Sequence, residues 1–340
     1  MKRPIIIVFA AAAAIWLALL PLLVGLYLRA WVPDWTAGWP DAEAAEFRAG
    51  WFRSVLRWQS ADGIELELQA RHVPPLKPGL VRIHGWINTP MTPEPVRLDG
   101  HLGLTGGWHL QARAAQVVDP GSLAQGARGL ELNFAQPAGQ PLTLIVRADE
   151  LGGEQPVDAP ALGQLRLMAR HHRDEAGAHH LGLDLSLEAE NLGTAGLTLS
   201  AGPAAPEAVE ELFDGLLQWA TSPADSFAQR MAVLTIVGAW QQLAAGGMVM
   251  RLEQMHFGEN TRLAGQWPIR LPQPRIEGAG RTDELINWYT ALAVRLGGQR
   301  RDQAELQGRA WLITLTQHGL IHLDEQRFRV QIPAAESPPP

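Results

Sequence analysis

An uncharged apolar run at residues 4–28 constrains this chain more than any other feature of its sequence. Basic residues border the run, with Lys2-Arg3 before it and Arg29 after it. A helix rises about 1.5 Å per residue, so such a run spans the hydrocarbon core of a bilayer, which is about 30 Å thick. We therefore predict a transmembrane anchor, with Ile5, Trp16 and Leu28 near its start, middle and end.

A cleaved secretory signal peptide is the alternative for this run. Signal peptides have an apolar core of about 7 to 15 residues, followed by a cleavage site with small residues. Here the run is longer, and it ends in Tyr27-Leu28-Arg29, which is a poor cleavage site. We therefore favour an uncleaved signal-anchor.

The charges on either side of the run predict its orientation. Lys2 and Arg3 precede it, whereas the residues after Arg29 include Asp34 and Asp41. Cytoplasmic flanks are enriched in basic residues, so we expect a single-pass protein with a cytoplasmic N-terminus. The bulk of the chain would then lie outside the cytoplasm.

Composition excludes some classes of protein. The formal net charge is −7 and no long basic run occurs, which argues against nucleic acid as a partner. The chain has no cysteine, so it has no disulfide bonds and its core alone must stabilise it.

The region after residue 48 is dominated by alternating apolar and polar residues, the pattern of strands with one buried face. Short turns rich in Gly, Pro and Asn separate these segments, which predicts an antiparallel meander. The strands are expected around residues 64–70, 96–104, 108–112, 130–134, 142–146, 165–169, 181–187, 248–257 and 263–271.

From Pro206 onward the apolar residues follow the helical period of 3.6. We predict helices starting at residues 206, 223 and 282, and a final hairpin with strand residues at 310–316, 321–323 and 328–332. The fold class is thus α+β and β-rich: an N-terminal transmembrane helix, then a large, mostly antiparallel, curved or twisted sheet with about three packed helices. The expected segments are 1–29 (N-terminus and anchor), 30–48 (linker), 49–205 (β-meander), 206–332 (helices and strands continuing the same domain) and 333–340 (disordered Pro-rich tail).

So few helices cannot cover so large a sheet. Either the sheet curls into a closed core, or it leaves an apolar concave face for a ligand, a partner or lipid. The candidate residues for such a face are Leu66, Leu68, Leu183 and Leu185.

Motifs for catalysis are scarce, since the sequence has no nucleophile elbow, phosphate-binding glycine loop or His-Glu-x-x-His helix. We therefore expect that the protein is not an enzyme and that it binds no cofactor. The weak candidates for a metal site are His171, His172, His179 and His180, two pairs flanking a polar segment that is a candidate hairpin loop. Solvated histidines at a hairpin end are the favoured interpretation, and a metal-dependent enzyme is a distant alternative.

The sequence Phe-Arg-Ala-Gly-Trp-Phe-Arg-Ser at residues 47–54, followed by a strand and by Arg-His-Val-Pro-Pro-Leu at residues 71–76, resembles the opening of the YdgA-type family of bacterial proteins. The closing residues 315–321 and 328–332 are similar to the family's final hairpin. The resemblance implies a periplasmic, β-rich domain anchored in the inner membrane. More distantly, the architecture resembles AsmA-type proteins.

Two functions remain open at this stage. One is a non-enzymatic envelope protein that binds lipid or another apolar ligand during envelope maintenance or assembly. The other is a structural or scaffolding component that docks other envelope or secretion proteins.

Overall fold

The structure is a computed structural model. It describes residues 29, 36, 45–50, 52–61, 63–72, 81–103, 107–119, 122–152, 160–221, 227–270, 274–296 and 298–332. The chain divides into two compact units, unit 1 (Met1–Asp149) and unit 2 (Glu150–Pro340). The change to the helical period at Pro206 falls inside unit 2.

Unit 1 is built from antiparallel strands in chain order. Its strands are β1 (Glu46–Arg48), β2 (Arg53–Gln59), β3 (Glu65–His72), β4 (Val81–Asn88), β5 (Val96–Leu102), β6 (Trp108–Asp119) and β7 (Ser122–Gln136), and most of β8 (Leu142–Leu151) also belongs to it. From β1 to β7 each strand pairs with the next, so this part is a meander. Short connections between sequential strands favour this arrangement.

The meander of unit 1 has an apolar and a polar face, because successive side chains point to opposite sides. Leu66 of β3 lies between Trp58 of β2 and Ile87 of β4 on the apolar face. On the other face, Arg57 forms an ion pair of 2.9 Å with Glu67. The helices whose bounds are described all belong to unit 2.

Unit 2 has a second run of antiparallel strands. They are β9 (Leu162–Arg173), β10 (His179–Ala189), β11 (Gly193–Ala204), β12 (Val249–Phe257), β13 (Thr261–Pro268), β14 (Arg275–Arg281), β15 (Ile321–Asp324) and β16 (Arg327–Ile332). They pair in the order β9-β10-β11-β12-β13-β14-β16-β15.

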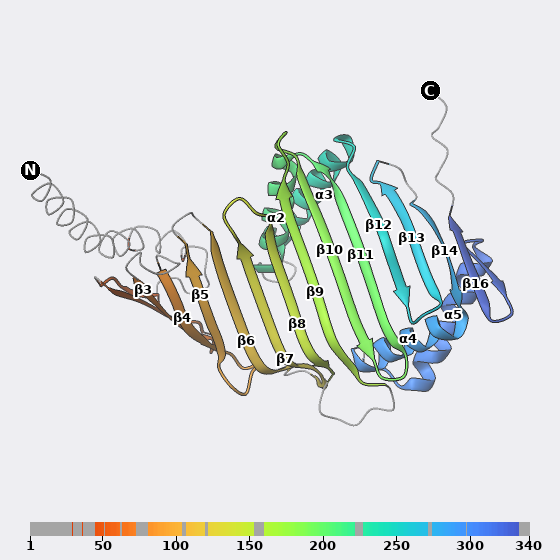
Figure 1. Cartoon of the computed structure of the whole chain (residues 1–340), viewed down its shortest axis with the longest axis horizontal. Helices are drawn as coiled ribbons and strands as arrows, with labels where there is room; N and C mark the ends of the chain where they lie inside the picture. Colours follow the sequence, from red (N-terminus) through yellow and green to blue (C-terminus); the bar gives the residue numbers. More distant parts are fainter. Residues whose placement is uncertain are drawn as a thin grey trace, which may run out of the picture. The chain divides into compact units, whose positions relative to one another are not determined.

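Two helix pairs pack against unit 2's strands at opposite strand ends (Figure 1). They are α2 (Pro206–Thr221) with α3 (Phe227–Ala245), and α4 (Thr282–Arg295) with α5 (Arg301–Gln317). Ala208 and Leu243 of the first pair share a core with Ala204 and Met248. Trp288 of α4, 1% exposed, belongs to a core with Leu162 and Leu187.

The predicted β-rich, mostly antiparallel fold is confirmed, and so are helices at Pro206 and Thr282. The expected strand at residues 310–316 is wrong, because these residues belong to α5. The error has a physical source. Ile313, Thr314 and Thr316 are β-branched and favour strands, but Ala304, Gly308 and Leu312 recur every four residues on the buried side of a helix.

The predicted anchor, including Ile5, Trp16 and Leu28, lies outside the described residues, as does the tail at 333–340. Within the part of the chain that the structure describes, no helix has the length and apolar character needed to cross a membrane.

Candidate functional site

Six leucines in the centre of unit 2's sheet form a half-buried apolar surface, which we call the leucine patch. It consists of Leu167, Leu183, Leu185, Leu197, Leu199 and Leu252. Strand pairing arranges them in two rows. One row joins Leu167, Leu185 and Leu197, and the next joins Leu183, Leu199 and Leu252.

The two helix pairs frame this patch on the same face of the sheet. Leu187 and Ala195, which continue the patch toward one strand end, pack with α4. Ala201, which continues it toward the other end, packs with α2 and α3. The leucines between them remain half-buried. Successive side chains along a strand point to opposite faces of the sheet. The charged Asp184 and Arg170 therefore face the side opposite the leucine patch.

A cavity of about 280 Å³ lies in unit 2, lined by side chains of α4, α5 and the strands from β12 to β16. Its lining is Met255, Phe257, Leu263, Ile276, Leu285, Tyr289, Leu292, Trp311, Leu315, Leu320, Ile321, Phe328, Val330 and Ile332. An apolar cavity of about 150 Å³ already binds benzene, so this one has room for a longer hydrocarbon.

Met255 connects the cavity to the leucine patch. It lines the cavity, and it pairs with Leu197 in the first row of the patch. The cavity and the leucine patch therefore adjoin at Met255.

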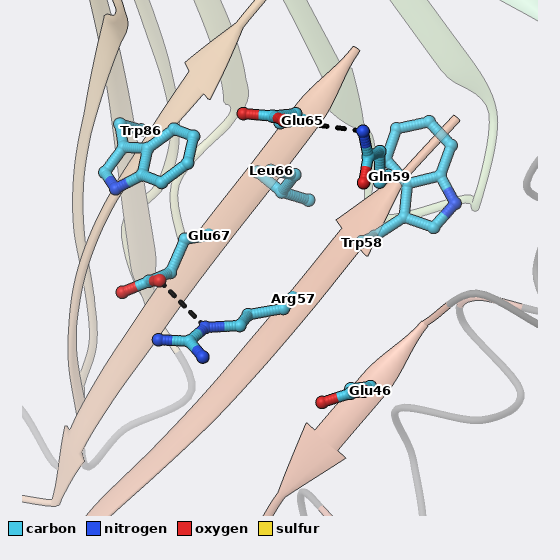
Figure 2. Close-up of a pocket in the computed structure, with 8 residues that line it drawn as sticks. All are labelled: Glu46, Arg57, Trp58, Gln59, Glu65, Leu66, Glu67 and Trp86. Carbon is cyan, nitrogen blue, oxygen red and sulfur yellow. Dashed lines mark hydrogen bonds and ion pairs between the residues drawn. The ribbon is translucent and has the colours of Figure 1, made fainter. Parts of the chain in front are cut away.

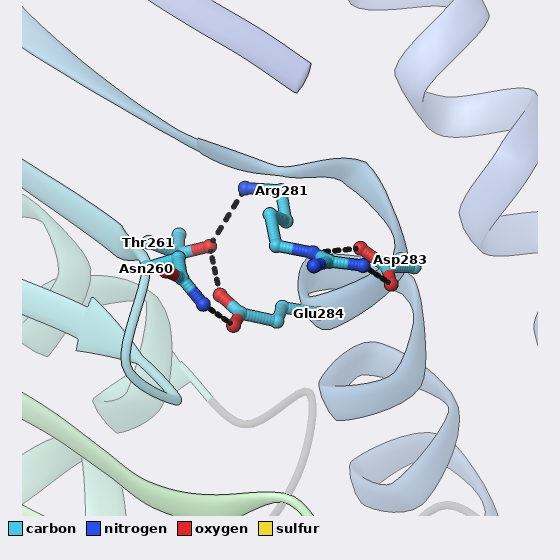
Figure 3. A network of polar contacts seen from close by, with 5 residues as sticks. All are labelled: Asn260, Thr261, Arg281, Asp283 and Glu284. Atoms are coloured by element: carbon cyan, nitrogen blue, oxygen red, sulfur yellow. Dashed lines mark hydrogen bonds and ion pairs between the residues drawn. The ribbon is translucent and has the colours of Figure 1, made fainter. Parts of the chain in front are cut away.

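A polar network fixes the start of α4, the helix that forms one wall of the cavity (Figure 3). Thr261 is fully buried, and its Oγ1 donates to Oε2 of Glu284 at 2.8 Å while accepting the backbone N–H of Arg281. Asn260 donates to the other carboxylate oxygen of Glu284 at 2.6 Å. The Arg281 guanidinium holds Asp283 with two hydrogen bonds, which lower the pKa of that carboxyl below its ordinary value.

A second, polar hollow of about 410 Å³ lies in unit 1 (Figure 2). It is lined by Glu46, Arg57, Trp58, Gln59, Glu65, Leu66, Glu67 and Trp86. The pKa of Glu67 lies below its ordinary value, because Gln69 donates a hydrogen bond to its carboxylate and Arg57 adds another bond and a positive charge. An ionised, paired carboxylate is a poor general acid at neutral pH.

The sequence-predicted histidines do come together in pairs. Nε2 of His171 lies 2.9 Å from Nδ1 of His179, and the rings of His172 and His180 stack with centroids 4.9 Å apart. His180 also contacts Asp174 at 3.0 Å. Among the described residues, however, no group of three or more His, Asp or Glu side chains is arranged so that it could hold a metal ion.

The four predicted face residues lie on apolar sheet faces, two in each unit. Leu66 is buried and Leu68 half-buried in unit 1, whereas Leu183 and Leu185 belong to the leucine patch. The sequence reasoning missed Leu197 and Leu199, because β11 is rich in glycine and small residues, and it missed the cavity, because α5 was expected as a strand.

Comparison with protein-family models, with curated proteins and with solved structures finds no match for this chain. The resemblance to the YdgA-type family therefore stays a hypothesis.

Proposed function

We propose that this protein binds the aliphatic chains of lipids in the bacterial envelope, as a non-enzymatic protein anchored in the inner membrane with its bulk in the periplasm. The cavity between α4, α5 and the sheet carries the proposal, because its lining is apolar. No lining residue is charged, and Tyr289 is the one whose side chain has a hydroxyl. Such a lining favours hydrocarbon over any polar ligand.

Energetics support exchange with a membrane. Burying a methylene group from water contributes about 0.8 kcal/mol. A chain that moves from a bilayer into this site exchanges one apolar environment for another, so the net free energy of that transfer is small. A small net free energy allows a lipid to enter and to leave, which suits envelope maintenance or assembly.

Native mass spectrometry of the full chain, released from mild detergent, tests the proposal. We expect lipid-bound mass on the wild type, and we expect Leu185→Asp to remove one lipid population while Ser186→Asp leaves it in place. Ser186 is an exposed neighbour on the opposite face of β10, so it is a matched control. Lipids bound to the predicted anchor should be the same in the wild type and in both variants, so only the lipid bound at the leucine patch should differ. Equal lipid-bound mass in all three would refute the proposal.

A scaffolding role is the second candidate, and the exposed apolar residues of α3 favour it. Phe227 and Leu234 of this helix are 78% and 62% exposed. Exposed apolar surface of this kind marks interaction sites.

A further inference from the structure

Helix α3 is apolar on nearly every side, yet only one side of it is covered. Ala232, Ala239 and Leu243 are buried, and Leu243 belongs to the core formed with α2. A helix that is apolar all round is normally enclosed by protein or lipid. The uncovered side of α3 therefore calls for a partner.

The uncovered side carries a continuous row, which we call the α3 stripe: Phe227, Met231, Leu234 and Val237. Their spacings of four, three and three residues place them on one helix face. All four are exposed large hydrophobic side chains. Gly238 belongs to the same face, and a Cβ added there would meet open space. A neighbouring helix can approach closely at such a position.

An acidic row on α2 lies beside the C-terminal half of α3, past the end of the α3 stripe. Glu207, Glu211 and Asp214 are spaced by four and three residues on one face of α2, and all are exposed. Nε2 of Gln242 on α3 donates to Oε2 of Glu211 at 2.9 Å, which joins this row to α3 one turn from Gly238. The acidic row contains no basic residue. Arg230 of α3 is exposed on the face of the α3 stripe, but it lies twelve residues before Gln242, where the acidic row meets α3.

We propose that the α3 stripe and the acidic row together dock an amphipathic helix of another protein, with an apolar stripe flanked by lysine or arginine. Apolar side chains of that helix cover the α3 stripe, and its basic residues meet the acidic row. A second copy of this chain would bring two acidic rows together. An anionic membrane surface would be repelled by them in the same way. Charge complementarity therefore selects a basic helix over both.

The test uses fluorescence from the stripe itself. The chain has no cysteine, so Leu234→Cys in the full chain takes a single environment-sensitive fluorophore. The protein is placed in phosphatidylcholine nanodiscs, and the probe is a designed amphipathic helix of leucine and lysine, about 18 residues or five turns long. A peptide with glutamate in place of every lysine is its mirror in charge. Leu306→Cys, on an exposed position of α5, is the control for labelling.

We expect the leucine–lysine peptide to shift the Leu234→Cys emission to the blue and to leave the Leu306→Cys emission unchanged. Reversing the charges with Glu211→Lys and Asp214→Lys should weaken the binding of the lysine peptide by about tenfold or more, and should strengthen the binding of the glutamate peptide. Three results would each overturn the proposal. The first is that the lysine peptide binds the charge-reversed protein as tightly as the wild type. The second is that spin-labelled phosphatidylcholine quenches the fluorophore, which would show contact with the membrane, and the third is a blue shift that grows with protein concentration without peptide, which would show contact with a second copy. None of them bears on lipid in the leucine patch, which Leu185→Asp tests separately.

Discussion

Met255 of β12 pairs with Leu197 of β11, so a residue that lines the cavity also borders the leucine patch. The cavity and the patch are therefore parts of one apolar surface inside unit 2. An aliphatic chain that enters the cavity can extend over Leu197 and Leu185 without meeting a charged side chain on that row. This continuity is why we treat the two as a single candidate site.

Filling the cavity should reduce lipid binding without unfolding the protein. Leu292 of α4 lines the cavity, and phenylalanine at this position would occupy part of its space. If the ring displaces two methylene groups of the ligand, at about 0.8 kcal/mol each, affinity falls about tenfold. Native mass spectrometry measures the lipid-bound fraction, and thermal unfolding checks the fold. Leu306→Phe, on the exposed side of α5, is the control. Unchanged lipid binding in folded Leu292→Phe would count against the cavity as the site.

Removing the hydroxyl of Thr261 should destabilise unit 2. Thr261→Val leaves a carboxylate oxygen of Glu284 and the N–H of Arg281 without this partner, at two part-buried hydrogen bonds beside the fully buried Thr261 side chain. The expected loss in free energy of unfolding is about 1–3 kcal/mol, measured by urea denaturation. Asn260→Ala removes an exposed bond to the same Glu284 and should cost less. If Asn260→Ala proved the more damaging of the two, burial would not be the deciding factor.

Two helical glycines should respond to alanine in opposite directions. At Gly238 of α3 the new Cβ has open space, so Gly238→Ala should raise the free energy of unfolding by about 0.5–1 kcal/mol. At Gly308 of α5 the Cβ would lie 2.9 Å from Cδ1 of Tyr289. Gly308→Ala should therefore destabilise by about 1–2 kcal/mol, because α5 or the ring must shift. Chemical denaturation compares the two variants, and stabilisation by Gly308→Ala would show that α5 packs less closely on α4.

Burial should make stability depend on pH through His171. The pKa of His171 lies below its ordinary value of 6.5, first because burial removes water from the ring and then because His179, His172 and Arg173 oppose a positive charge. The unfolded chain takes up this proton near its ordinary pKa, whereas the folded chain resists it. The free energy of unfolding should thus fall as pH drops below 6.5 toward the folded pKa.

Replacing that ring should flatten this dependence. His171→Gln should have a smaller loss of stability below pH 6.5 than the wild type, and both are referenced to their own stability near pH 8, where the imidazole is neutral in both states. The pKa values of Asp174 and Asp283 are also lowered, from an ordinary value of 3.8. These carboxyls therefore change the stability below about pH 4 and do not affect the range near pH 6.5. Identical slopes in the two proteins would remove His171 from the explanation.

Alternation made much of the sheet predictable. Leu66 and Leu68 in β3, and Leu183 and Leu185 in β10, alternate with polar residues and fell on apolar faces as expected. In β11 the pattern is weaker, because glycines and the Gly202-Pro203 pair interrupt it, and this strand was not predicted. Hydrogen bonding to β10 and β12 on either side holds β11 in the strand conformation that its own sequence pattern does not predict.

The cavity could not be predicted, because it depends on tertiary packing. Trp311 and Leu315 lie in a segment rich in β-branched residues that local preference assigns to a strand. The segment is a helix instead, and Leu312 packs against Ile321 and Phe328 of the final hairpin. Once α5 is a helix, the space between it, α4 and the sheet appears, together with its lining.

Photo-crosslinking in intact bacterial envelopes tests lipid binding most directly. A photoreactive amino acid replaces Leu185 in the leucine patch or Ser186 on the opposite face of β10, in the full chain. The mass of the adduct then identifies what each face contacts. We predict lipid adducts at position 185 and none at position 186. Protein adducts alone at position 185, or lipid adducts of equal yield at both positions, would contradict it.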